Sequence, residues 1–253
     1  MKFIGIIPAR YASTRFPGKP LVDIQGKTMI QRVYEQAMKA PSLSQVVVAT
    51  DDKRIFDHVA TFGQVVYTSA DHPSGTDRCY EAATSMAGTL GTEPHDVIVN
   101  IQGDEPFIQP GQIELLCEAF RSPGVDIATL VRAIESDQEL FGENTVKVVR
   151  NALGYALYFS RNPVPFVRGF PREQWLQKQT FFKHIGMYAY RYQVLGQITR
   201  LPQSELEKAE SLEQLRWLEN GYPVFTRQTQ IEAIAIDTPE DLQKLSSPPA
   251  NPL

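Results

Sequence analysis

The chain has 253 residues, 42% hydrophobic and 21% charged, which fits one large globular domain or two small ones. Its formal net charge of −4 and the absence of a basic face argue against nucleic acid as the main partner. No apolar run approaches the roughly 18 residues of a membrane span, and no leader pattern opens the chain, so we expect a cytoplasmic protein without membrane insertion. Cys79 and Cys117 lack the spacing of a zinc site or a disulfide framework, which favours buried thiols in a reducing compartment.

The first part of the chain alternates between strand and helix patterns. An apolar run predicts a strand over residues 2–9, and Thr28 caps a helix whose apolar residues follow helical spacing. Residues 45–50 predict a strand buried on both faces, residues 55–60 a second helix, and residues 64–69 a third strand. This order is typical of a doubly wound α/β fold with a mostly parallel sheet.

A cationic loop follows the first strand. Ligands of open α/β sheets bind outside the carboxyl ends of the strands, where guanidinium and backbone N–H groups reach phosphate oxygens. The loop does not match the phosphate-binding Walker A motif, because Ser13 stands where that motif has glycine and Pro20 follows Lys19. It therefore predicts either a different triphosphate site or a solvated basic loop without a ligand, and its polar residues are Arg10, Ser13, Thr14, Arg15 and Lys19.

Two further loops belong to the same predicted sheet edge. The loop over residues 71–78 ends in a hydroxyl able to cap a helix, and it is either a plain βα turn or a small-residue loop against a base or sugar. Residues 96–106 predict a fourth strand that delivers Asp104 and Glu105 at its end. Carboxylates facing a phosphate loop predict Mg²⁺, which one or two carboxylates hold together with substrate phosphates. The alternative is a turn with exposed acids.

In the second half of the chain, from residue 127, strand patterns replace the alternation of strand and helix. Four strand-like runs predict an antiparallel extension of the sheet, over residues 127–134, 146–150, 156–160 and 185–190. An arm rich in proline, aromatic residues and arginine, over residues 161–183, lies between the third and fourth of these runs. Leucine spacing then predicts one helix over residues 206–218 that stops at Gly221.

The chain ends with a last strand and helix. The strand covers residues 232–236, and Asp237 precedes a helix capped by Thr238. We expect a single domain over residues 1–245 and a flexible tail over residues 246–253.

Taken together, these motifs resemble the 3-deoxy-manno-octulosonate cytidylyltransferases, or CMP-KDO synthetases. The likeness runs from residue 3 to about residue 245. Each motif alone is modest evidence, and it is their joint order along the chain that is specific to the family. The motifs cover residues 7–21, 48–51, 74–78, 99–106, 146–149, 156–161, 183–190, 212–216 and 237–241. Residues 162–166, the arm and Ala235-Ile236 depart from the family pattern, which puts the arm geometry and the fine sugar specificity in question.

The resemblance implies a homodimeric nucleotidyltransferase with a dimerisation and sugar-binding subregion near residues 127–200. It implies Mg²⁺-dependent transfer of CMP from CTP to 3-deoxy-D-manno-octulosonate (KDO), with release of pyrophosphate, for lipopolysaccharide synthesis. Three residues would be catalytic: Arg10, Lys19 and Asp104. The implied CTP-binding set is Arg10, Ser13, Arg15, Lys19, Ser74, Gly75 and Arg78. The implied sugar pocket is Gln102, Arg161, His184, Tyr188, Glu213 and Gln214. The implied metal ligands are Asp104 and Asp237.

Alternative functions remain open at this stage. A related acidic sugar, 8-amino-KDO or sialic acid, would use the same chemistry, and the motifs after Ser160 favour KDO over sialic acid. A sugar-1-phosphate nucleotidyltransferase would need a glycine-rich opening in place of Pro8-Ala9-Arg10. A non-catalytic nucleotide-binding regulator would not need Lys19, Asp104 and Asp237 together.

Overall fold

The computed structural model describes residues 1–12, 16–93, 96–231, 236 and 241–242. The chain divides into two compact units: Met1–Glu93, Asn100–Pro110 and Ala233–Leu253 form unit 1, and Pro94–Val99 and Gly111–Glu232 form unit 2. None of the helices in the described ranges is long and apolar enough to cross a membrane.

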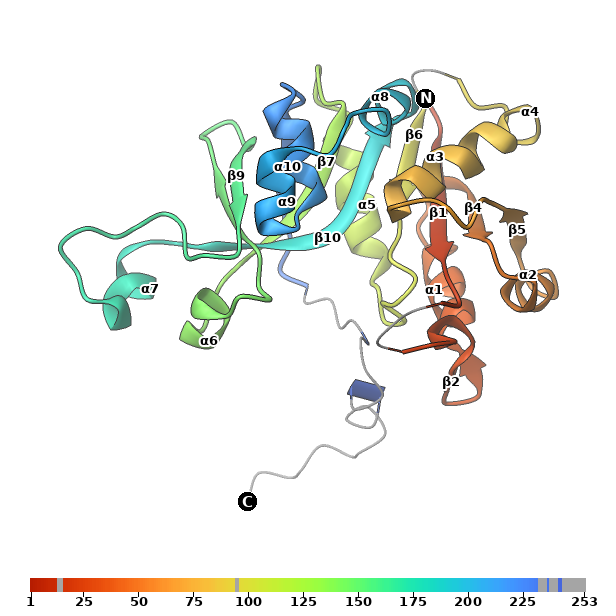
Figure 1. Cartoon of the computed structure of the whole chain (residues 1–253), viewed down its shortest axis with the longest axis horizontal. Coiled ribbons are helices and arrows are strands. Elements are labelled where there is room, and N and C mark those ends of the chain that lie inside the picture. The colour runs from red at the N-terminus through yellow and green to blue at the C-terminus, as the bar shows by residue number, and fades with distance from the viewer. Residues whose placement is uncertain (13–15, 94–95, 232–235, 237–240, 243–253) are drawn as a thin grey trace. The chain divides into compact units, whose positions relative to one another are not determined.

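A parallel sheet forms the core of unit 1 (Figure 1). Its strands are β1 (Phe3–Ala9), β4 (Leu43–Thr50) and β5 (Gln64–Tyr67). Continuous apolar runs suit strands covered on both faces, and Ile6, Val47 and Val48 are fully buried. Helices pack on this sheet: α1 (Met29–Ala37), α2 (Lys53–Val59) and α3 (Gly75–Ser85). The predicted βαβαβ order is confirmed.

Short elements complete unit 1. They are the 3-10 helix η1 (Lys19–Leu21), the hairpin of β2 (Asp23–Ile24) with β3 (Lys27–Thr28), and helix α4 (Ala87–Leu90). Thr28 caps α1 as predicted, with its hydroxyl accepting from the Gln31 N–H. β6 (Val97–Asn100) reaches the boundary of the units, and the next residue, Ile101, donates to the Ile6 carbonyl at 2.9 Å.

Unit 2 holds the predicted antiparallel extension. β10 (Phe182–Arg191) runs antiparallel to β7 (Ile127–Ala133), and β8 (Lys147–Arg150) runs antiparallel to both β9 (Ala156–Ser160) and β10. An unpredicted strand, β11 (Val224–Gln228), pairs with β7 in parallel. Its helices are α5 (Pro110–Ala119), α6 (Asp137–Phe141), α7 (Trp175–Lys178) after the 3-10 turn η2 (Arg172–Gln174), and α8 (Tyr192–Ile198).

The single helix predicted over residues 206–218 is wrong. The segment forms α9 (Glu205–Glu210) and α10 (Glu213–Glu219), with Ser211 between them at a φ of 52°. Ser204 closes a capping box at the start of α9 with Glu207, so this helix has its own strong beginning. The leucine spacing suggested one continuous buried face. In the structure Leu206 is exposed whereas Leu212 is buried, so these two leucines do not share such a face.

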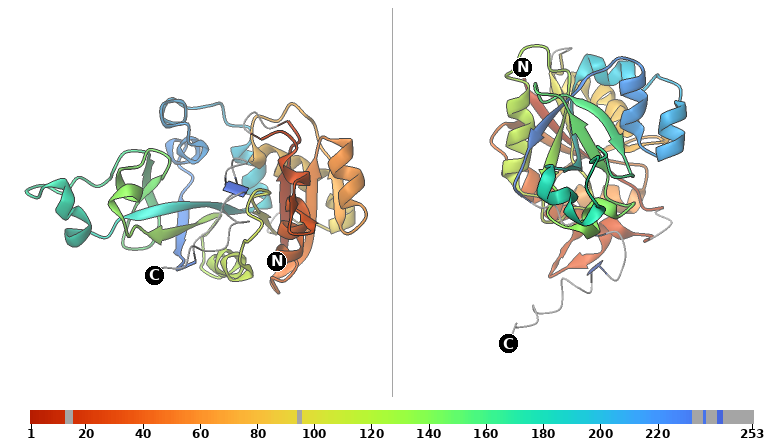
Figure 2. Two further views of the ribbon diagram at one scale, coloured as in Figure 1. Left: turned by 90° about the horizontal axis from the view of Figure 1, so that it is seen from below. Right: turned by 90° about the vertical axis from the view of Figure 1, so that its left-hand side faces the viewer.

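The arm over residues 161–183 is part of unit 2 and packs against α6. Trp175 of α7 and Phe181 pack with Leu140 of α6 in a small apolar cluster, and α6 and α7 lie side by side (Figure 2). Phe166 remains 74% exposed on this arm. The predicted strand over 232–236 lies outside the described residues apart from Ile236, as does the predicted tail.

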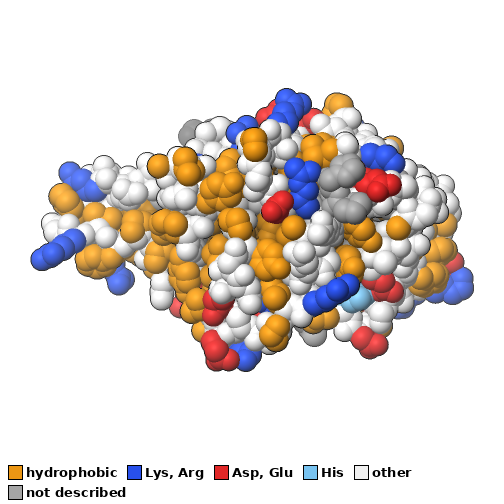
Figure 3. Space-filling view, turned by 90° about the horizontal axis from the view of Figure 1, so that it is seen from above, with side chains coloured by type: hydrophobic (Ala, Val, Ile, Leu, Met, Phe, Trp, Pro, Cys, Tyr) orange, Lys and Arg blue, Asp and Glu red, His pale blue; other side chains and the backbone are white. Residues whose placement is uncertain are grey.

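Hydrophobic and charged side chains of both signs are interspersed on the face of the molecule shown in Figure 3. Both cysteines, Cys79 and Cys117, are buried free thiols, as predicted.

Candidate active site

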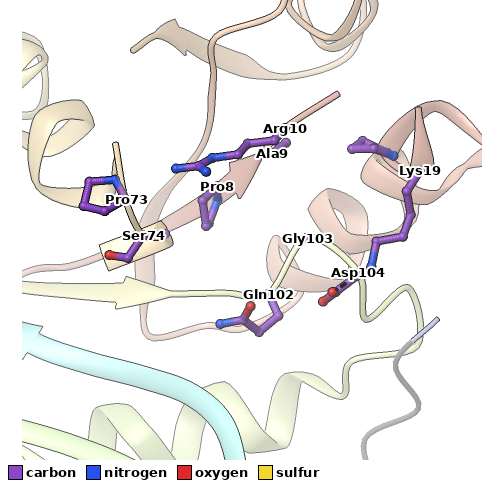
Figure 4. Close-up of a pocket in the computed structure, with 11 residues that line it drawn as sticks. Pro8, Ala9, Arg10, Lys19, Pro73, Ser74, Gln102, Gly103 and Asp104 are labelled. Atoms are coloured by element: carbon purple, nitrogen blue, oxygen red, sulfur yellow. Dashed lines mark hydrogen bonds and ion pairs between the residues drawn. The ribbon is translucent and has the colours of Figure 1, made fainter. Parts of the chain in front are cut away.

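A cavity of about 280 Å³ lies at the C-terminal end of β1 in unit 1 (Figure 4). Four separate stretches line it: Pro8–Arg10, Lys19–Pro20, Pro73–Gly75 and Gln102–Asp104. The sheet edge that the strand order predicts as the ligand site is therefore the edge that carries the cavity. Six of the predicted site residues line it: Arg10, Lys19, Ser74, Gly75, Gln102 and Asp104.

Lys19 and Asp104 form an ion pair in the wall of this cavity. The Lys19 Nζ lies 2.9 Å from the Asp104 Oδ2, and the side chains are 13% and 31% exposed (Figure 4). Gly18 directs the chain into Lys19 with a φ of 75°, a conformation that favours glycine, and its N–H donates to the Tyr11 carbonyl. The cation and the carboxylate, 85 residues apart in the chain, therefore meet where both are accessible to a ligand.

Gly103 allows Asp104 to approach β1 closely. A Cβ atom on Gly103 would lie 2.8 Å from the Pro8 carbonyl oxygen, which is backbone and cannot turn away. We expect Gly103→Ala to lower the free energy of unfolding by about 1–3 kcal/mol, because the backbone must shift to relieve this contact. Urea denaturation measures the loss. The matched control is Gly88→Ala, whose added Cβ meets nothing within 4 Å; equal stability of the two variants would contradict the proposed close approach.

Arg10 lies on the side of the cavity that carries the β5–α3 loop. Its guanidinium donates to the His72 carbonyl, and the His72 ring pairs with the Glu81 carboxylate. Ser74 caps α3 by accepting from the Asp77 N–H at 3.2 Å. The loop predicted over residues 71–78 is therefore shorter than expected, because Gly75 and the three residues after it form the first turn of α3.

Arg78 does not line the cavity. It is fully buried, with Nη2 lying 3.1 Å from the Asp51 Oδ2 and Nη1 donating to the Thr68 hydroxyl. Burial, with nearby Arg10 adding to it, lowers the pKa of Arg78, while Asp51 opposes that shift. In this structure Arg78 braces the end of β4 against α3. Asp51 follows a strand as Asp104 does, but it was not among the predicted site residues.

Two acidic residues, Asp104 and Glu105, follow β6, and Asp104 offers a carboxylate oxygen to a cation in the cavity. Asp104 is accessible in the cavity, while Glu105 is 6% exposed and its Oε2 has no hydrogen-bond partner in the described part of the chain. Burial, with Asp104 adding to it, raises the pKa of Glu105 to about 7. No three His, Cys, Asp or Glu side chains group around a common point within the described ranges. The Asp104 carboxylate suits a hard cation that takes its remaining ligands from water or phosphate, as Mg²⁺ does.

His184 and Tyr188 lie together on β10 in unit 2. Their ring centroids are 5.1 Å apart, and the His184 Nε2 lies 3.0 Å from the Thr129 hydroxyl. β10 carries two extra residues between Ile185 and Tyr188, so the two rings keep the common face that simple alternation predicted. Burial, with Glu213 nearby, raises the pKa of the Tyr188 phenol well above its usual range. Tyr188 is therefore a neutral hydrogen-bonding group, and burial keeps His184 neutral as well.

The neutral state of His184 predicts a pH dependence of stability. Burial lowers the pKa of His184 to about 3, whereas an unfolded histidine titrates near 6.5. The unfolded chain binds the proton first, so this stabilisation is complete above pH 6.5 and is lost as the pH falls towards 3. Between pH 7 and pH 5, we expect the free energy of unfolding of the unsubstituted protein to fall by roughly 1 kcal/mol more than that of His184→Gln, allowing for partial exposure of the ring. Urea titrations at the two pH values measure both losses. Equal losses would show that His184 is not held neutral by burial.

The remaining predicted sugar residues also belong to unit 2. Arg161 follows β9, and its Nε and Nη1 donate to the carbonyls of Glu210 and Glu143. Glu213 begins α10 and accepts from the Arg216 Nη2 at 2.8 Å. Gln214 is only 5% exposed, so the solvated helix face considered for it is wrong. Three predicted residues, Ser13, Arg15 and Asp237, lie outside the described residues.

Comparison with known proteins identifies the family. The family model described as cytidylyltransferase matches residues 4–234. A protein of Parabacteroides distasonis is 59% identical over 96% of both chains, and one of Bacteroides thetaiotaomicron is 57% identical over 96% of both; each is named 3-deoxy-manno-octulosonate cytidylyltransferase.

A solved structure supports the same assignment. It is that of CMP:2-keto-3-deoxy-manno-octonic acid synthetase complexed with CTP, which superposes with a TM-score of 0.87 at 42% identity and covers 97% of each chain. The mostly parallel sheet with its antiparallel part is thus the nucleotidyltransferase-type fold predicted from the sequence. Family model, relatives and fold together show that this chain belongs to the cytidylyltransferase family, among the 3-deoxy-manno-octulosonate cytidylyltransferases.

Proposed function

We propose that this protein transfers CMP from CTP to KDO and releases pyrophosphate, which activates the sugar for lipopolysaccharide synthesis in the cytoplasm. The observation that carries the proposal is the cavity where Arg10, Lys19 and Asp104 converge, in a chain whose relatives are named for this reaction. Cations and an accessible carboxylate at one sheet edge suit a nucleoside triphosphate.

The reaction needs positioning and charge stabilisation more than a protein nucleophile. The anomeric hydroxyl of KDO attacks the α-phosphorus of CTP. The new bond joins that oxygen to phosphorus, the bond from phosphorus to the pyrophosphate oxygen breaks, and the hydroxyl proton passes to water. Negative charge grows on the leaving pyrophosphate. Arg10 and Lys19 line the cavity as cations and would offset that charge. Ser74 and Gly75, at the start of α3, would lie against the cytidine side of the nucleotide.

Asp104 would hold Mg²⁺, and we propose Asp237 as its second protein ligand. The accessible Asp104 carboxylate in the cavity fits an oxygen-liganded cation. When bound, Mg²⁺ would act as a Lewis acid and orient the phosphate and sugar oxygens. Lys19, paired with the Asp104 Oδ2, would keep that carboxylate in a fixed orientation.

Residues of unit 2 would recognise the sugar. KDO carries one carboxylate and many hydroxyls. Arg161 would pair with the carboxylate through Nη2, since its Nε and Nη1 already donate to backbone carbonyls. Neutral His184 and Tyr188 would hydrogen-bond hydroxyls, together with Glu213 and Gln214, whose buried Nε2 has no partner among the described residues. A neutral pair of rings suits hydroxyl recognition because it adds no competing charge.

We also propose a homodimer that forms through the region near residues 127–200. Leu157 and Phe166 in this region are 59% and 74% exposed, and Phe170 on the arm is 42% exposed. Exposed large apolar side chains on one region favour burial against a partner. Light scattering of the purified protein measures the mass in solution, and a monomer at working concentration would contradict the dimer.

Pyrophosphate release from CTP by the purified protein tests the proposed function. We expect release that requires both KDO and Mg²⁺, with CMP-KDO as the other product. Parallel reactions with 8-amino-KDO and sialic acid test the sugar. Release with sialic acid but not KDO would overturn the substrate, and no release with any acidic sugar would favour a non-catalytic nucleotide-binding regulator.

A further inference from the structure

Glu210 bonds to Arg161 through both its side chain and its backbone. One carboxylate oxygen, Oε1, accepts from the Ser160 hydroxyl at 2.7 Å, and the other, Oε2, accepts from the Arg161 N–H at 2.8 Å. The Glu210 carbonyl accepts from the Arg161 Nε at 2.7 Å. A single residue of α9 therefore fixes the backbone of Arg161 and the base of its guanidinium.

Lys147 completes the frame around Arg161. It is fully buried, and its Nζ donates to three carbonyls: those of Gly142, Thr145 and Arg161, at 2.7, 2.7 and 2.6 Å. The N–H and the C=O of Arg161 are thus both held by charged side chains. The carboxylate of Glu210 also places a negative charge near two cations, Lys147 and Arg161. Charged partners make such hydrogen bonds shorter and stronger than neutral ones.

The same residue fixes where α10 begins. Glu210 is the last residue of α9, Ser211 follows in the left-handed conformation, and Glu213 opens α10. A non-glycine residue at positive φ persists only where the surrounding structure holds it. The bonds from Glu210 to the end of β9 anchor one side of this turn, so they set the spacing between Arg161 and the pair Glu213–Gln214.

We propose that Glu210 is a positioning residue that holds Arg161 in register with Glu213 and Gln214, and so sets the affinity for the acidic sugar. This rests on the proposed function. Glu210 acts through Arg161 and does not touch the sugar. Its loss would misplace the guanidinium that pairs with the sugar carboxylate.

Steady-state kinetics of Glu210→Gln test the inference. The amide keeps one acceptor oxygen, so either the Ser160 hydroxyl or the Arg161 N–H loses its partner. We expect the KM for KDO to rise about tenfold, as the loss of one charged hydrogen bond would produce, and the KM for CTP to stay within about twofold. Glu210→Asp keeps both oxygens on a shorter stem and should give an intermediate KM for KDO. The matched control is Glu205→Gln, on the same helix, where a side chain 88% exposed pairs only with Lys208 in the described contacts.

A double-mutant cycle with Arg161→Ala separates positioning from a general structural role. If Glu210 acts through Arg161, then adding Glu210→Gln to Arg161→Ala should raise the KM for KDO by no more than about twofold. Thermal unfolding and CTP binding report whether each variant is folded. An unchanged KM for KDO in Glu210→Gln, equal increases for KDO and CTP, or additive effects in the double mutant would each overturn the inference. Absence of KDO-dependent release by the parent protein would instead overturn the proposed function.

Discussion

Asp104→Asn is expected to lower kcat for pyrophosphate release by about 10²–10³-fold, with the fold intact. The substitution keeps the size and one acceptor oxygen but removes the charge that pairs with Lys19 at 2.9 Å in the cavity. It also removes the anionic oxygen that Mg²⁺ prefers, so raising the Mg²⁺ concentration should restore only part of the rate. The measurement is the initial rate of pyrophosphate release as Mg²⁺ is titrated at saturating CTP and KDO.

Asp57→Asn provides the matched control for this experiment. Asp57 lies on α2 in the same unit, with a side chain 58% exposed and paired with Lys53 on the surface. Its substitution should leave the rate unchanged, because an exposed ion pair contributes little. A near-normal rate of Asp104→Asn at saturating Mg²⁺ would exclude Asp104 as a required metal ligand.

Strand runs and strand ends were the part of the fold that the sequence predicted well. Continuous apolar stretches marked β1, β4 and β6, because a strand covered on both faces has no polar side. β11 was missed, since Arg227 and Gln228 within it make the segment look like a polar turn. The break at Ser211 was also missed, because a positive φ at a residue other than glycine leaves no mark in hydrophobic spacing.

Some features of the candidate site could be predicted from the sequence, and others could not. Arg10, Lys19 and Asp104 could be brought together from the sequence, because each follows a strand whose end must lie at one sheet edge. The buried position of Arg78 could not be predicted from the sequence, because its contact with Asp51 depends on how α3 packs against β4. The role of Glu210 was equally hidden, since its bonds to Arg161 depend on how α9 ends and not on a motif.

Lys19→Met should lower kcat by about 10²-fold or more, and it tests the cationic half of the site. Methionine keeps much of the stem volume but removes the ammonium, which pairs with Asp104 at the end of a side chain that is 13% exposed. The charge that would offset the leaving pyrophosphate is then lost, so the chemical step should suffer more than the KM for KDO. Lys27→Met, which removes a surface lysine paired with Glu35 on half-exposed side chains, should change neither constant.

The contact between Lys19 and Asp104 sharpens this test. Because their side chains touch, the losses from Lys19→Met and Asp104→Asn should not add in the double variant. Removing Lys19 alone leaves Asp104 without its cation, whereas removing both charges leaves neither group unpaired. We therefore expect the double variant to lose less than the product of the two single losses. Full additivity would mean that the ion pair does not persist during turnover and that the two residues act on the triphosphate independently.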